Sequence, residues 1–172
     1  MGNHRFYRII NIIILPVSAF IALQVLMSIF VALANPAMLL GIFVLACVPL
    51  YAFTANYFYN KSIKKGEYCK PSLKDWIKVN AIVSLIFCAL AIFGCLGLLM
   101  LLDNEKRLNE LLQQMPSSPT GPLSMEEFKK LLKFYVYFFL PFTILLVIHI
   151  IITFRLLRKY KHMFGYSTND PQ

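Results

Sequence analysis

The chain has 172 residues, of which 59% are hydrophobic and 15% are charged, and its formal net charge is +9. Soluble domains have about 45–50% apolar and about 25% charged residues, so this composition excludes a soluble globular domain, a disordered tail and a disulfide scaffold. It predicts a small polytopic membrane protein that forms one membrane domain over residues 1–172.

Four apolar stretches have the length of membrane spans. A bilayer core about 30 Å thick needs roughly 20 apolar residues in a helix, because only an internally bonded backbone is stable there. The stretches contain no Asp or Glu, and they are residues 9–34, 37–59, 77–102 and 134–157. The first is far longer than the 7–15 residues or so of a signal-peptide core, so we expect an uncleaved helix. The fold class is therefore an all-α integral membrane protein with two tandem helical hairpins.

The first two spans are separated by Asn35 and Pro36 alone, which predicts a tight antiparallel turn. On these spans Gln24, Ser28 and Asn56 are candidates for hydrogen bonds between helices.

The segment 60–76 is strongly basic and contains the helix breakers Gly66 and Pro71. We expect its lysines to contact anionic lipid headgroups, since each basic residue near such a surface contributes about 1 kcal/mol. These candidate lipid contacts are Lys61, Lys64, Lys65, Lys70 and Lys74. Nothing resembling a nucleic-acid-binding motif accompanies the charge, so no nucleic-acid partner is predicted.

The third span carries small and polar residues at helical spacing, namely Asn80, Ser84, Cys88, Ala91 and Cys95. Small residues let helices approach closely, and Asn bonds across helix interfaces, so close packing is the favoured interpretation. A polar passage lined by Asn80 and Ser84 is the alternative.

The segment 103–133 is predicted to form an outer helical hairpin. Residues 104–112 have the pattern of a polar extension of the third helix, and the Pro-rich stretch 115–122 ends it. Ser124 and Glu127 predict a capping box at the start of the next helix, with Leu123 packed on Phe128. The hairpin is either a docking element or a plain solvated connection.

His149 is the ionisable side chain nearest the middle of a span, and intramembrane ionisable groups are functional candidates. Thr153 lies one turn later on the same face, where it is expected to bond one imidazole nitrogen. The alternatives are a neutral His bonded within the bundle and a proton-linked or ligand-binding His.

Basic residues alternate along the chain with uncharged or balanced segments. The N-terminal segment, the 60–76 region through Lys78, and the tail carry net charges of +2, +4 and +3, whereas the two remaining connections are neutral. The positive-inside rule then places both termini and the 60–76 loop in the cytoplasm, and the expected membrane is a plasma membrane or bacterial inner membrane.

The sequence contains no recognisable set of catalytic or metal-binding residues. Its four cysteines include no pair on the outer side, which excludes a disulfide-generating membrane oxidoreductase. The three histidines are scattered, so no metal site, haem or other cofactor is predicted. Cys69 is either an idle thiol or a regulatory or palmitoylated one.

These observations favour a non-enzymatic accessory or assembly subunit that binds a membrane protein partner or a second copy of itself. The alternative is a small transporter or channel that uses His149, and a membrane enzyme acting on a lipid is third.

Overall fold

The computed structural model describes residues 2–114 and 124–165, and in this part of the chain the secondary structure is helical apart from one isolated bridge. Four helices are long and apolar enough to cross a membrane, as expected for a multi-pass membrane protein. These segments are Arg5–Ala32, Pro36–Lys64, Pro71–Leu102 and Met125–Lys159.

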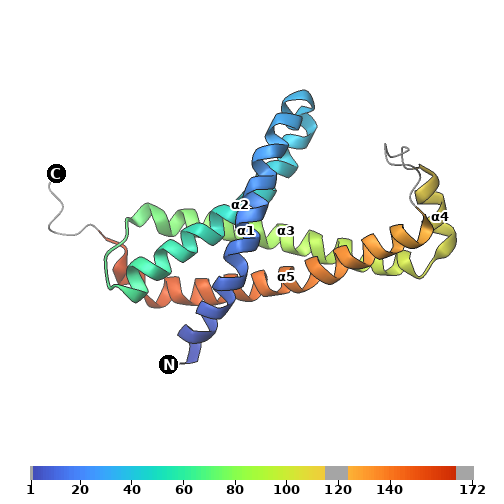
Figure 1. Ribbon diagram of the computed structural model, residues 1–172. Coiled ribbons are helices and arrows are strands. Elements are labelled where there is room, and N and C mark those ends of the chain that lie inside the picture. Colours follow the sequence, from blue (N-terminus) through green and yellow to red (C-terminus); the bar gives the residue numbers. More distant parts are fainter. Residues whose placement is uncertain (1, 115–123, 166–172) are drawn as a thin grey trace. The chain divides into compact units, whose positions relative to one another are not determined.

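The first half of the chain contains α1 (Gly2–Ala34), the short helix η1 (Pro36–Met38) and α2 (Leu39–Phe58), and α2 continues as a π-helix, η2 (Tyr59–Lys64). Asn35 caps η1, because its side-chain oxygen accepts a hydrogen bond from the Ala37 amide at 3.3 Å. α1 and α2 pack directly against each other, as Figure 1 shows.

The second half contains α3 (Pro71–Leu102), α4 (Glu105–Gln114), α5 (Met125–Lys159) and the short helix η3 (Lys161–Met163). Helical structure therefore enters the predicted loop 60–76 from both ends. Gly66 lies in the remaining connection with a φ of 74°, a left-handed conformation that favours glycine. Pro71 begins α3, where its missing amide hydrogen costs nothing.

The chain divides into two compact units, one formed by Met1–Phe87 with Leu145–Gln172 and the other by Cys88–Ile144. In the first unit, α1 buries one stripe of residues three or four positions apart, and α5 does the same. The members of the α1 stripe are Tyr7, Ile10, Asn11, Ile14, Ser18, Ile21 and Val25. The opposite faces of these helices are apolar and exposed, as expected where side chains face lipid.

Two predictions for the segment 103–133 have different outcomes. The capping box is confirmed, since the Ser124 amide donates to Glu127 Oε2 at 2.9 Å and the Glu127 amide donates to Ser124 Oγ at 3.3 Å. The continuous extension of the third helix is wrong. α3 ends at Leu102, and Asn104 caps a new helix by accepting from the Arg107 amide at 3.2 Å. Leu123 and the whole Pro-rich stretch 115–122 lie outside the described residues.

Candidate functional site

A cluster of four polar side chains lies inside the first unit, and we call it the polar cluster: Tyr7 of α1, Tyr51 of α2, and His149 and Thr153 of α5. All four have no exposed surface. The Tyr51 hydroxyl lies 2.8 Å from His149 Nδ1 and donates to Thr153 Oγ1 at 2.9 Å. The cluster therefore joins three helices through hydrogen bonds that are shielded from water.

Thr153 is the hub of the polar cluster. Its hydroxyl donates to the backbone carbonyl of His149 at 2.8 Å, and the Tyr7 hydroxyl lies 3.3 Å from the same oxygen. The Thr153 proton is thereby used, so both tyrosine hydroxyls approach Oγ1 as donors.

This arrangement assigns the proton on the His149 ring. The Tyr51 hydroxyl has one hydrogen, which it gives to Thr153, so its oxygen receives the hydrogen of His149 Nδ1. His149 is then a neutral imidazole with a bare lone pair on Nε2. That nitrogen is buried and has no hydrogen-bond partner in the described chain.

Aromatic rings enclose the same imidazole. The Tyr7 ring stacks on it with ring centroids 4.6 Å apart, and the Tyr51 ring meets it edge-on at 5.6 Å. Tyr7 also contacts Tyr59 at 4.8 Å. These contacts fix the ring orientation in addition to the hydrogen bonds.

The expected bond between Thr153 and the imidazole is not present. Thr153 bonds back to the carbonyl one turn earlier, a common arrangement for Thr in a helix, and Tyr51 takes the ring nitrogen instead. Tyr7 and Tyr51 were not predicted from the sequence, although a tyrosine within an apolar span signals a hydroxyl that needs a partner.

Asn80 and Ser84 of α3 are also buried, but no described hydrogen bond links them to the polar cluster. Asn80 donates to the Trp76 carbonyl of its own helix at 2.8 Å, and the Ser84 hydroxyl has no partner among the described residues. Both positions have the burial expected for close helix packing.

A second set of polar contacts joins α1 and α2. Asn11 donates to Asn56 Oδ1 at 2.6 Å, and Asn60 donates to the same oxygen at 2.9 Å. The predicted role of Asn56 as an interhelical hydrogen-bonding residue is thus confirmed.

Gln24 differs from these residues because it lies on the exposed side of α1. Its amide has no hydrogen-bond partner among the described residues. It lines a shallow hollow of about 360 Å³ together with Phe20, Leu23, Met27, Ser28 and Val31. We call this surface the Gln24 face.

The lysines expected to contact lipid headgroups lie in different surroundings. Lys64, Lys65 and Lys70 are exposed, whereas the Lys61 ammonium lies 5.7 Å from the centre of the Tyr57 ring. Lys74 lies 6.0 Å from the centre of the Phe164 ring and lines a hollow at the end of α5.

Protein-family models, curated proteins and solved structures were compared with this chain, and none matches it. The described residues also contain no group of three or more His, Cys, Asp or Glu side chains that would hold a metal ion. The function of this chain is therefore inferred from its own residues and their geometry.

Cys69 is part of a contact between the α2–α3 connection and the segment after α5. Its amide donates to the Met163 carbonyl at 2.8 Å, and its carbonyl accepts from the Gly165 amide at 3.2 Å. The Ser62 hydroxyl donates to the Cys69 sulfur at 3.0 Å. Because Cys69 is 1% exposed, this site does not suit palmitoylation or another modification that requires an accessible thiol.

Proposed function

We propose that this protein is a non-enzymatic accessory or assembly subunit, and that it associates with another transmembrane helix through the Gln24 face. The observation that supports this function is the exposed, unpartnered amide of Gln24 on a largely apolar surface of the membrane-spanning helix α1.

An amide without a hydrogen-bond partner is costly in hydrocarbon. A polar group without a hydrogen-bond partner costs several kcal/mol in the bilayer core, because no water is available there. Membrane helices meet this need by bonding Gln, Asn or Ser side chains across their interfaces. Ser28 lies one turn from Gln24 and adds a second polar group to the same surface.

A second copy of this chain has the right chemistry for the face. An amide is both a donor and an acceptor, so two Gln24 side chains can satisfy each other across a twofold axis. A different subunit with an amide or hydroxyl at the same depth meets the same requirement.

The topology we propose has two tandem hairpins with both termini in the cytoplasm. The alternation of net charge supports this orientation. Two contacts also support it, since Tyr7 near the start of α1 meets Thr153 near the end of α5, and Cys69 pairs with residues that follow α5. Both contacts are expected if these ends lie on one side of a plasma membrane or bacterial inner membrane.

The test compares Gln24→Leu with Leu26→Ala, which alters an exposed α1 residue outside the lining of the hollow. Each tagged protein is extracted from its own host with native lipids, and the mass of the intact complex is measured. We expect the native chain and Leu26→Ala to retain a stoichiometric partner or second copy, and Gln24→Leu to run as a single chain. Equal association of all three proteins would overturn the proposal.

A second candidate function is proton-linked transport through His149. The buried Nε2 without a partner favours it, because a bare lone pair accepts a proton or a ligand. Flux in liposomes that is present in the native protein and lost in His149→Ala would support this function, and the absence of flux in both would remove it.

A further inference from the structure

Two neighbouring hollows lie at the end of α5, where the last membrane-spanning turns meet the start of α3. One has a volume of about 460 Å³ and is lined by Ile151, Phe154, Arg155, Arg158 and Lys159. The other has a volume of about 400 Å³ and is lined by Lys74, Lys78, Phe154, Leu157, Arg158 and Lys161. Phe154 and Arg158 belong to both, so they form the boundary between the hollows.

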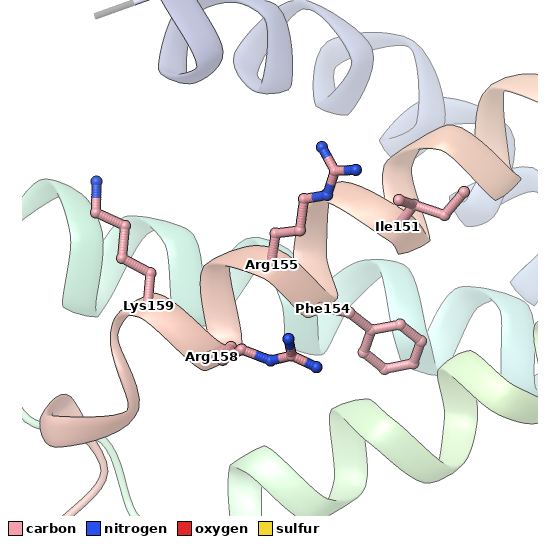
Figure 2. Close-up of a pocket in the computed structure, with 5 residues that line it drawn as sticks. All are labelled: Ile151, Phe154, Arg155, Arg158 and Lys159. Atoms are coloured by element: carbon pink, nitrogen blue, oxygen red, sulfur yellow. The ribbon is translucent and has the colours of Figure 1, made fainter.

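The lining side chains of α5 leave the helix in two directions, as their spacing along the helix requires. Figure 2 shows Arg155 and Lys159 leaving one side of α5, whereas Phe154 and Arg158 leave another side together. Residues four apart share a face of a helix, so the apolar ring and the guanidinium lie next to each other along that face.

The charge of this region is almost entirely positive. Six of the lining residues are basic, and one acidic side chain of the described chain, Asp75, pairs with them. That ion pair joins Asp75 to Lys78 at 4.0 Å between exposed side chains, so solvent screens it. Arg158 and Lys161 have no acidic partner in the described residues.

The apolar lining distinguishes an amphiphile from a free anion. Ile151, Phe154 and Leu157 lie on the same helical turns as the basic residues and belong to the fourth candidate span. A free phosphate would use the charges and leave this apolar surface uncovered. A phospholipid uses both, since its phosphate meets the basic side chains and its acyl chains follow the apolar ones.

We propose that the two hollows form a binding site for an anionic phospholipid. The lipid phosphate lies between Arg158, Lys161 and Lys78, and Arg158 bonds it through two parallel N–H donors. An acyl chain packs along Phe154 and Ile151. Basic pockets between transmembrane helices are a known mode of anionic headgroup recognition. The site involves Lys74 but not the exposed lysines of the α2–α3 connection.

The experiment uses the full chain in detergent, with phosphatidylglycerol and phosphatidylcholine of identical acyl chains as probes. Retention of each lipid is measured by native mass spectrometry. We expect the native protein to retain phosphatidylglycerol in preference to phosphatidylcholine. The double variant Arg158→Gln/Lys161→Gln should bind phosphatidylglycerol at least about tenfold more weakly, with binding of phosphatidylcholine unchanged.

The matched control is Lys64→Gln/Lys65→Gln, which removes the same charge from two exposed residues outside both hollows. We expect it to reduce phosphatidylglycerol binding less than threefold. An equal loss in both double variants would show diffuse attraction to basic residues and would overturn the proposal. Displacement of the lipid by millimolar inorganic phosphate would show a simple anion site, which also overturns it.

A third variant tests the role of the guanidinium. Arg158→Lys retains the charge but loses the two parallel donors, so we expect a loss of phosphatidylglycerol binding between those of the native protein and the Gln double variant. Unchanged binding in both Arg158→Lys and the Gln double variant would contradict the assignment of Arg158.

Discussion

The polar cluster and the Gln24 face both contain polar side chains within membrane-spanning helices. They differ in whether those side chains have hydrogen-bond partners in the chain. In the polar cluster, Tyr51, His149 and Thr153 bond one another, and His149 Nε2 is the atom left without a described partner. On the Gln24 face, the whole amide is without one. Polar residues that bond one another inside a membrane protein hold its own helices together, whereas the exposed amide of Gln24 lies where we propose a contact with another helix.

The largest effect of breaking the polar cluster is expected from Thr153→Val. This change removes the hydroxyl that donates to the His149 carbonyl and accepts from the Tyr7 and Tyr51 hydroxyls. The valine side chain keeps the shape of the threonine. Two of these hydrogen bonds join different helices and average about 0.6 kcal/mol each, and their loss also takes a buried acceptor away from the Tyr7 and Tyr51 hydroxyls, so the free energy of unfolding should fall by about 2 kcal/mol. Titration with a denaturing detergent in mixed micelles measures it.

Thr143→Val is the control for that change. Thr143 is also buried on α5, but its hydroxyl donates to the Phe139 carbonyl of its own helix. The expected loss is well under about 1 kcal/mol. If the two variants lose equal stability, the polar cluster does not act as a link between helices.

Tyr51→Phe should have an intermediate effect. It removes the bonds to His149 Nδ1 and Thr153 Oγ1 but keeps the aromatic contact with the imidazole. We expect the free energy of unfolding to fall by about 1 kcal/mol, measured in the same titration. Tyr137→Phe, at a position that is 75% exposed, should leave it unchanged. A neutral result for Tyr51→Phe would contradict a stabilising role for these two hydrogen bonds.

Gln24→Leu should have the smallest effect on the single chain, within about 0.5 kcal/mol, since it removes no described contact. The measurement is the same titration at a dilution where the native chain is monomeric. The test compares this change in the free energy of unfolding with the larger one expected for Thr153→Val. A loss as large as that of Thr153→Val would mean that Gln24 bonds inside its own chain.

The sequence was sufficient to predict the helical class and the four long apolar helices, because bilayer thickness and backbone bonding leave few alternatives. The start of α5 was also predictable, since a capping box is a local signal between Ser124 and Glu127. The break between α3 and α4 was missed because the two residues that separate the helices, Asp103 and Asn104, include neither Pro nor Gly, although Asn104 is a good capping residue.

The polar cluster was predicted in part. His149 and Thr153 were identified because they lie one turn apart on one helix, so their proximity follows from helical spacing. Tyr7 and Tyr51 come from other helices, and helical spacing does not determine which faces of two helices meet. The same reason explains why Arg158 and Lys161 were not grouped with Lys78, which lies far away in the chain but lines the same hollow.

The pairing of Cys69 with Phe164 has a consequence for the order of folding. The two residues are separated by most of the second half of the chain, yet the connection between α2 and α3 acquires its backbone partners from the residues after α5. Chains are made from the N-terminus, so these partners are absent until the last long helix has been synthesised. The α2–α3 connection is therefore completed among the last parts of the protein, although it is made before the middle of the chain.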